Sequence, residues 1–358
     1  MRIGIVTQPL RNNYGGILQN YALQQVLKRL GHTPVTIDFI PQMSLWRFVL
    51  STCKTIVLYF IPGRKCPFAP YRLRRNPEMS AFVETYIVRT RLVKKYSAKL
   101  LDEYHIENLI VGSDQVWRPC YNRYPEDTFL RFARHTNMRK VAYAASFGVS
   151  DLEFSKRQLQ RCVPLLRQFD KVSVREASGV DLCRNYFHTE AEHVLDPTLL
   201  LDKEDYEAVC TGISKRNGKF IACYLLDPTG EQQRYIDRIA QHLHLAPVYF
   251  TADKKASLSV EEWLAMFRDA AYVVTDSFHG TVFSIIFRKP FITIVNNARG
   301  ADRFVSLLRT VRLENRLISS AEALTEELYG NPIDWQTVDA ALLATRVKSM
   351  NYLQNALN

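Results

Sequence analysis

The chain contains no run of about 18 uncharged apolar residues, the length that a membrane-spanning helix needs. Its seven cysteines are scattered without any CxxC pair, which argues against a disulfide framework and against a zinc site. A GxGxxG fingerprint, internal repeats and low-complexity tracts are also absent. The apolar start, Met1 to Thr7, is too short for a signal peptide and is typical of a first core strand. We therefore expect a cytoplasmic globular protein that holds no metal ion.

The length of 358 residues allows two domains of ordinary size, and 47% apolar with 23% charged residues is typical of a soluble globular protein. Strand and helix patterns alternate through both halves of the chain. Residues 2–39 form a strand, a helix and a second strand, and the alternation begins again at Lys219. This predicts an α/β fold of two Rossmann-like, doubly wound domains that face a cleft. We place the domains at residues 1–200 and 201–333, with a C-terminal helix, 334–358, that packs back on them.

The net charge of +11 is concentrated in residues 41–100, which hold 12 bases and only two acids. This insertion begins with apolar stretches such as Leu45 to Leu50 and Ile56 to Pro62. Bases beside apolar side chains suit a membrane with anionic headgroups, and we predict membrane contact through residues about 45–75. Two alternatives stay open: a helical hairpin packed on the domain with solvated basic faces, and a nucleic-acid patch. The aliphatic content exceeds what phosphate contact needs, so we expect no nucleic acid partner.

The most informative stretch is Asp276 to Thr281, with the sequence DSFHGT, which lies between a strand pattern and a buried helix pattern. A turn from strand to helix directs free backbone N–H groups and the positive helix end at a ligand, which favours an anion. His279 would stand beside that anion as a proton donor. The alternative is an Asp or Ser that caps the helix, with a histidine packed for structural reasons.

Two further loops follow expected strands, at the edge where open sheets bind ligands. The first contains Asn13, Tyr14, Gly15 and Gly16, and the second, GSDQVW, runs from Gly112 to Trp117. The glycine pair lets the backbone approach a ligand or a neighbouring loop closely. A nicotinamide or flavin site is disfavoured, because the first loop is long, polar and lacks GxGxxG.

Five motifs, in this order, resemble the polysaccharide pyruvyl transferase family. They are NYGGILQNYAL from Asn13, GSDQVW from Gly112, SVRE from Ser173, DP at Asp196 and DSFHG from Asp276. The resemblance covers about residues 2–300 apart from the basic insertion, and it implies a fold similar to the two-domain glycosyltransferase B type. It also implies that phosphoenolpyruvate is used to place a cyclic pyruvate ketal on a sugar of a cell-surface glycan.

By this resemblance, Arg175 binds the anionic groups of the donor and His279 is the general acid. Many family members have RLHG where this chain has SFHG, so one donor-binding arginine is missing at Ser277. We expect Arg288 in the donor site as its replacement. The other basic candidates are Lys289, Arg299 and Arg303, and a different position of the donor is a further alternative.

Phosphoenolpyruvate carries a carboxylate and a phosphate, which an arginine and a helix N-terminus bind well, so Ser277, Gly280 and Thr281 are also expected in the donor site. Ketal formation requires a proton on the methylene carbon, and an imidazolium can donate one near neutral pH. Asp114 is the candidate base for the attacking hydroxyl, the alternative being a carboxylate that caps its turn. Amide and aromatic groups suit a sugar, so the residues expected on the acceptor side are Asn13, Tyr14, Gly15, Gly16 and Trp117.

We therefore predict a bacterial, phosphoenolpyruvate-dependent pyruvyltransferase of capsular polysaccharide or exopolysaccharide biosynthesis. The expected acceptor is a lipid-linked oligosaccharide, modified by a peripheral protein at the inner membrane face, and no cofactor besides the donor substrate is expected. Two rival functions stay open. A glycosyltransferase of the same architecture would bind a sugar nucleotide in its second domain, and a non-catalytic glycan-assembly protein would need neither His279 nor Arg175.

Overall fold

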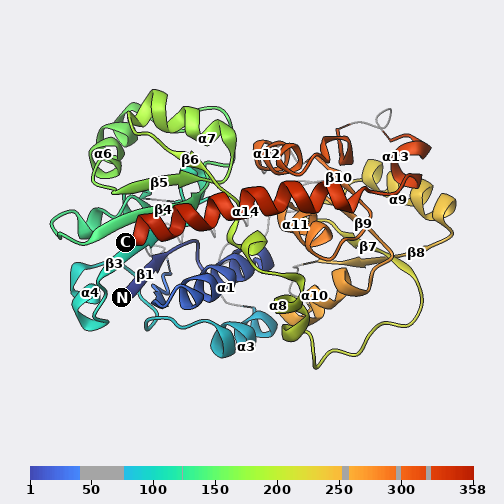
Figure 1. Ribbon diagram of the computed structural model, residues 1–358, viewed down its shortest axis with the longest axis horizontal. Helices are drawn as coiled ribbons and strands as arrows, with labels where there is room; N and C mark the ends of the chain where they lie inside the picture. The colour runs from blue at the N-terminus through green and yellow to red at the C-terminus, as the bar shows by residue number, and fades with distance from the viewer. Residues whose placement is uncertain (41–75, 123, 252–257, 296–299, 320–323) are drawn as a thin grey trace, which may run out of the picture.

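The computed structural model describes residues 1–40, 76–122, 124–251, 258–295, 300–319 and 324–358. Two parallel β-sheets, each flanked by helices, form two α/β domains that lie side by side (Figure 1). The fold class predicted from the sequence is confirmed. The residues predicted to contact a membrane, about 45–75, lie outside the described residues.

The first sheet has six strands in the order β2-β1-β3-β4-β5-β6, and each neighbouring pair is parallel. Alternate residues face opposite sides: Ile3 and Ile5 of β1 belong to one apolar cluster and Val6 to another. Both faces are therefore buried, as is usual for a parallel sheet. The strands are β1 Arg2–Val6, β2 Thr33–Thr36, β3 Asn108–Val111, β4 Arg139–Ala145, β5 Lys171–Val174 and β6 Glu192–His193.

The second sheet has five strands in the order β11-β10-β9-β7-β8, again parallel throughout. Ala222 and Tyr224 of β7 face one apolar cluster, whereas Ile221 and Cys223 face another. The strands are β7 Phe220–Tyr224, β8 Ala246–Phe250, β9 Tyr272–Thr275, β10 Phe291–Ile294 and β11 Leu317–Ile318.

Several helices begin at a side chain that caps their first turn. Ser155, Thr229 and Ser259 each form a capping box with the Gln or Glu three residues later. The helices of the first domain are α1 Tyr14–Arg29, α3 Pro77–Tyr86, α4 Ala98–Glu103, α5 Pro125–Thr128, α6 Lys156–Leu166 and α7 Ala177–Leu182. Those that follow are α8 Lys203–Val209, α9 Gly230–Leu243, α10 Val260–Asp269, α11 Phe278–Ile286, α12 Asp302–Thr310, α13 Glu326–Gly330 and α14 Trp335–Leu357.

One apolar cluster runs through both domains. It joins side chains of β1, β4 and α1 to side chains of β7, α10 and α11. At the junction the ring of Tyr14 on α1 stacks on Trp263 of α10, with the centroids 5.2 Å apart. The Tyr14 hydroxyl also donates to the Leu258 carbonyl oxygen at 2.6 Å. Because the core side chains of the two domains interdigitate, the domains form one packed unit.

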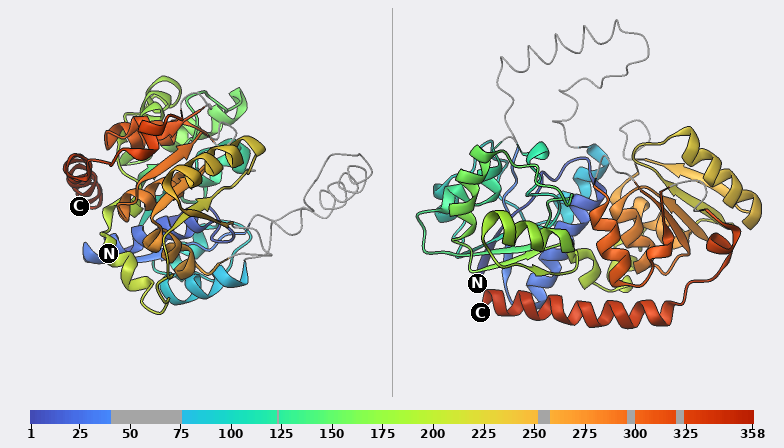
Figure 2. Two further views of the ribbon diagram at one scale, coloured as in Figure 1. Left: turned by 90° about the vertical axis from the view of Figure 1, so that its right-hand side faces the viewer. Right: turned by 90° about the horizontal axis from the view of Figure 1, so that it is seen from above.

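The C-terminal helix α14 runs across both domains and lies against them (Figures 1 and 2). Its Tyr352 hydroxyl donates to the Ala142 carbonyl oxygen of β4 at 2.9 Å. The guanidinium of Arg346 donates to the carbonyl oxygens of Leu199 and Leu201. These bonds hold the last helix to the first domain.

The described part of the basic insertion, residues 76–100, packs on the first domain. Helix α3 buries Met79, Phe82 and Val83, and Arg89 pairs with Asp38 at 3.0 Å. Among the described residues, no helix combines the length and the apolar character needed to cross a membrane.

The strand order reverses at an equivalent place in each sheet. The reversal lies between β1 and β3 in the first sheet and between β7 and β9 in the second. In open α/β sheets, the carboxyl ends of the two strands at such a reversal leave a crevice in which ligands bind. The loops after these four strands are therefore the expected place for a functional site.

We predict that Trp263→Ala lowers the free energy of unfolding by about 3–5 kcal/mol, because it leaves a cavity where the two domains meet. Urea unfolding followed by circular dichroism measures this change. The matched control is Leu343→Ala on α14: Leu343 is 60% exposed, and its truncation should cost less than about 0.5 kcal/mol. Equal effects of the two substitutions would contradict a shared core.

Candidate active site

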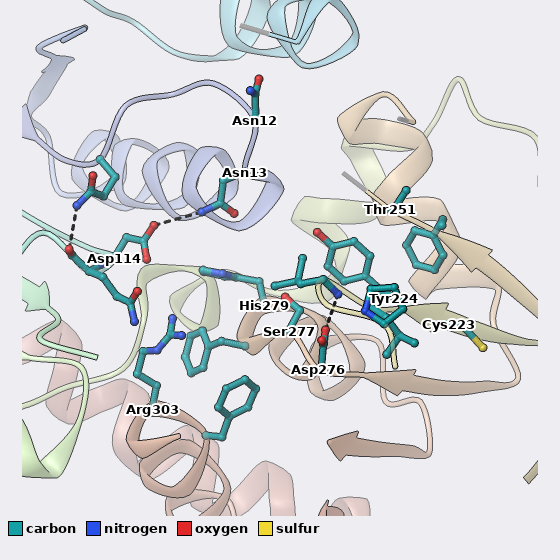
Figure 3. Close-up of a pocket in the computed structure, with 18 of the residues that line it drawn as sticks. Asn12, Asn13, Asp114, Cys223, Tyr224, Thr251, Asp276, Ser277, His279 and Arg303 are labelled. Atoms are coloured by element: carbon teal, nitrogen blue, oxygen red, sulfur yellow. Dashed lines mark hydrogen bonds between the residues drawn. The ribbon is translucent and has the colours of Figure 1, made fainter. Parts of the chain in front are cut away.

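A cavity of about 1090 Å³ opens between the two domains, at the strand-order reversals of their sheets. The loops that follow β1, β3, β7 and β9 line it, together with the end of β8 and the start of α12. Figure 3 shows Asn13 and Asp114 of the first domain on one side and His279, Ser277 and Arg303 of the second on the other. The cavity thus combines polar side chains from both domains with the N-terminal end of α11.

His279 is the second residue of α11. Ser277 caps this helix, since its hydroxyl accepts a hydrogen bond from the Gly280 N–H at 3.4 Å. The imidazole packs directly on Gly15 of α1, where a methyl group would lie 1.9 Å from Nδ1. Glycine is therefore required at position 15, and it lets the histidine of one domain contact the first helix of the other.

Asp114 follows β3 and has a left-handed backbone conformation, with φ of 72°. Its side chain points toward His279 across the cavity (Figure 3). Oδ1 accepts hydrogen bonds from the Gln115 N–H at 2.9 Å and from Arg175 Nη2 at 3.3 Å. Oδ2 accepts one from Asn13 Nδ2 at 3.4 Å. The carboxylate is therefore held in place on both of its oxygens while it still lines the cavity.

A buried carboxylate, Asp196, lies behind these two residues. It accepts hydrogen bonds from Arg175 Nη1 at 2.7 Å, Thr198 Oγ1 at 2.7 Å and Ser113 Oγ at 3.2 Å. Nε2 of His279 is 3.7 Å from its Oδ2. Burial alone would raise the pKa of Asp196, but the nearby His279 and Arg175 hold that pKa well below its usual value. Asp196 therefore stays ionised and links the two domains electrostatically.

Arg175 does not reach the cavity. Its side chain is 1% exposed, and its guanidinium is bonded to Asp196 and Asp114. The structure therefore does not support the expected direct contact of Arg175 with a donor. The arginine instead holds the two carboxylates in place.

Arg303 lies at the start of α12. Among the described residues that line the cavity, it is the single arginine or lysine. Its guanidinium lies 5.3 Å from the ring centroid of Phe278, and the guanidinium of Arg175 lies 4.6 Å from the same centroid. Burial and the charge of Arg175 lower the pKa of Arg303 to about 10, so the side chain is still a cation at neutral pH.

The expectation that Arg288 replaces the missing donor arginine is wrong. Arg288 follows the C-terminal end of α11, whereas the cavity meets the N-terminal end of that helix. Its side chain is 60% exposed and pairs with Asp339 of α14 at 2.7 Å. Arg299, another candidate, lies outside the described residues.

The two aromatic residues expected on the acceptor side are buried instead. Tyr14 stacks on Trp263, and Trp117 stacks on Phe129 at 5.1 Å with its Nε1 donating to the Thr128 carbonyl oxygen. Neither ring lines the cavity, so the prediction that they contact a sugar is wrong. Both rings turn into the core because aromatic partners surround them there.

Four small residues of the predicted site also lie behind the cavity surface. Gly15 allows α1 to approach His279, a methyl group at Gly16 would lie 3.1 Å from Asn13 Nδ2, and one at Gly280 would lie 2.3 Å from Thr275 Oγ1. The Thr281 hydroxyl is 2.7 Å from that of Thr293. These residues shape the wall of the site, and Asn13, Asp114, Ser277 and His279 are the predicted residues that line it.

Sequence reasoning considered Asp276 only as a possible helix cap and did not select Gln8 or Asn12, because their roles depend on the loops around them. Asp276 accepts hydrogen bonds from the N–H groups of Leu226 at 2.6 Å and Asp227 at 3.1 Å, which joins the loops after β7 and β9. Gln8 and Asn12 line the cavity from the loop after β1. Both follow the carboxyl end of a predicted strand, and this position could have identified them as candidates for the site.

The arrangement suits proton transfer beside an anion. An imidazole and a carboxylate face each other, a cation lies close by, and the positive end of α11 opens at the same place. In the described part of the chain, no group of three or more His, Cys, Asp or Glu side chains is arranged to hold a metal ion.

Three solved structures are among those with a similar fold. S. aureus MnaA, in a co-structure with UDP, has 12% identity and a TM-score of 0.46, over 99% of this chain and 90% of the other. The spinosyn rhamnosyltransferase SpnG has 11% identity and a TM-score of 0.45, over 99% and 96%. E. coli ADP-heptose LPS heptosyltransferase II has 10% identity and a TM-score of 0.39, over 96% and 99%. No curated protein matches the sequence.

The two parallel-sheet domains with a cavity between them define a glycosyltransferase B-like α/β protein. The model of one family, "Polysaccharide pyruvyl transferase", matches residues 13–298, which is more than half of the chain. The protein therefore belongs to the polysaccharide pyruvyl transferase family, as its motifs predicted.

We predict that Gly15→Ala destabilises the protein by about 1–3 kcal/mol, because the added methyl group overlaps the His279 ring and forces α1 and α11 apart. Thermal unfolding by calorimetry measures the change. Gly230→Ala in the first turn of α9 is the control, since a methyl group there meets open space and alanine favours the helix. An unchanged melting temperature for Gly15→Ala would contradict the close contact.

Proposed function

We propose that the protein transfers the pyruvyl group of phosphoenolpyruvate to a sugar of a surface-polysaccharide precursor and forms a cyclic ketal. The observation that carries the proposal is the pair His279 and Asp114, which come from different domains and face each other across one cavity. A donor that carries a phosphate and a carboxylate suits a cavity where Arg303 and the start of α11 meet.

In the proposed reaction, a protonated His279 gives its proton to the methylene carbon C3 of phosphoenolpyruvate, and C2 becomes an oxocarbenium-like centre. A sugar hydroxyl attacks C2 while Asp114 accepts its proton. The bond between C2 and the phosphate oxygen then breaks, and phosphate leaves with the proton from Asp114. A second hydroxyl of the same sugar attacks C2 and closes the ring, and its proton returns to His279.

The cavity volume favours a reaction of two substrates. About 1090 Å³ is at or above the upper end of the range of roughly 300–1,000 Å³ common for small-molecule sites, so a donor and a sugar fit together. The polar residues on the first-domain side, Gln8, Asn12 and Asn13, offer amide groups to sugar hydroxyls.

Purified protein should release phosphate from phosphoenolpyruvate only when a membrane extract with lipid-linked oligosaccharides is added. We predict that His279→Ala lowers this rate about 10²- to 10⁴-fold, because the proton donor is lost. Asp114→Asn should also lower it, because an amide keeps the shape but cannot accept the proton. A coupled phosphate assay measures the rate, and His135→Ala at an exposed position is the control.

Acceptor-dependent release that persists in His279→Ala would rule out this histidine as the acid. No release by the wild-type protein, together with binding of uridine or guanosine diphosphate, would favour the rival glycosyltransferase function. Unchanged pyruvylation of cellular glycan in a His279→Ala strain would favour the non-catalytic assembly protein.

We further propose that the acceptor is linked to a lipid and that the protein meets it at the inner membrane face. The support is the charge of residues 41–75, which contain seven bases and no acid beside their apolar stretches. Each base near an anionic surface contributes about 1 kcal/mol to binding.

Neutralising the seven bases of residues 41–75 with Gln should weaken binding to vesicles of phosphatidylglycerol and phosphatidylcholine at least tenfold in a sedimentation assay. The turnover of a soluble sugar acceptor should not change. The matched control removes the same charge from exposed positions elsewhere, namely Lys28, Lys156, Arg157, Lys171, Lys215, Arg234 and Lys348. If both variants lose vesicle binding equally, the net charge and not this segment determines membrane contact.

A further inference from the structure

The cavity offers few cations to an anionic ligand. Arg175 lies behind the cavity wall, bonded to Asp196 and Asp114. Arg288 lies at the other end of α11 and pairs with Asp339. Position 277 lines the cavity but carries a serine. Among the described residues, this leaves Arg303 as the arginine whose side chain lines the cavity.

The start of α12, and with it Arg303, is fixed by contacts with the first domain. Gly300 has φ of 91°, and a methyl group there would lie 1.8 Å from the Gly148 carbonyl oxygen. One turn further on, the Ser306 hydroxyl accepts a hydrogen bond from the Ala177 N–H at 3.0 Å. A short helix held at both points presents Arg303 in one place, so little ordering is needed when a ligand binds.

The surroundings of Arg303 favour an anion. The side chain is buried, and it shares the Phe278 ring with the guanidinium of Arg175. Burial, with Arg175 close by, lowers the pKa of Arg303 to about 10, so the side chain is still a cation at neutral pH. The fork of a guanidinium matches a carboxylate or a phosphate in the cavity.

We propose that Arg303 binds an anionic group of phosphoenolpyruvate, a role for which the serine at position 277 offers no cation. This inference rests on the function proposed above. Ser277 and Arg303 line the same cavity, so the positive charge reaches the donor from α12 instead of from the turn before α11.

Titration calorimetry of the full chain with phosphoenolpyruvate and with inorganic phosphate tests the inference. Arg303→Met should weaken binding of phosphoenolpyruvate about 10- to 100-fold, the range for loss of a charged hydrogen bond. Arg303→Lys should lose part of the affinity, because an ammonium ion lacks the planar fork. Arg288→Met, the same change at an exposed arginine, should bind like wild type.

Two further measurements separate ligand binding from a structural role. Methionine fills a similar volume without placing a second cation beside Arg175, so Arg303→Met should keep the wild-type melting temperature or raise it. Adding Ser277→Arg to Arg303→Met should restore at least tenfold of the lost affinity, because it returns a cation to the same cavity.

The outcomes distinguish this inference from the proposed function. Equal affinity of wild type and Arg303→Met for phosphoenolpyruvate would overturn the role of Arg303 and leave the proposed function standing. A parallel loss of affinity and melting temperature, without rescue by Ser277→Arg, would show that Arg303 is structural. No binding of phosphoenolpyruvate by wild type, with or without acceptor, would overturn both.

Discussion

The site depends on the need to neutralise one buried carboxylate, Asp196, where the two domains meet. An unpaired charge at this depth would be strongly destabilising, so donors and cations must surround it. Arg175 and Thr198 donate from the first domain, and His279 approaches from the second at 3.7 Å. The Arg175 guanidinium that neutralises Asp196 also pairs with Asp114. The same arginine therefore holds the Asp114 carboxylate, which lines the cavity, from the buried side. The positions of both candidate catalytic groups thus follow from one buried charge.

Close packing makes this arrangement rigid. The imidazole fits against α1 only because position 15 has no side chain, and one apolar cluster continues from the first sheet through Tyr14 and Trp263 into the second domain. Opening the domains would expose that cluster and separate His279 from Asp196. Burial of apolar surface therefore opposes opening. His279 and Asp114, the two candidate groups for proton transfer, therefore line one cavity without a large movement of the domains.

The sequence predicted which residues follow the strands, because that depends on local patterns. It did not predict whether a side chain faces the core or the cavity, because that depends on tertiary packing. His279 and Asp114 follow strands at the carboxyl edge, and strand periodicity places that edge without tertiary information. Whether a ring such as Trp117 faces a cavity or the core depends on which partners surround it, which no local pattern records. Arg288 is close to His279 in sequence, but nine residues of α11 at about 1.5 Å each separate the cavity end of the helix from its other end by about 13 Å. Arg303 is distant in sequence and adjacent in space because α12 docks on the first domain.

The aromatic ring at position 278 has a physical role beside the two buried arginines. An anion needs a cation within contact distance, and no particular element has to supply it. When the arginine comes from α12, it approaches Arg175, and two guanidiniums in one buried region repel each other. An aromatic ring at the start of α11 can attract both guanidiniums through its face, whereas a leucine side chain cannot. Phe278 contacts both guanidiniums in this chain. The Phe278 ring therefore helps to accommodate two cations in one buried region.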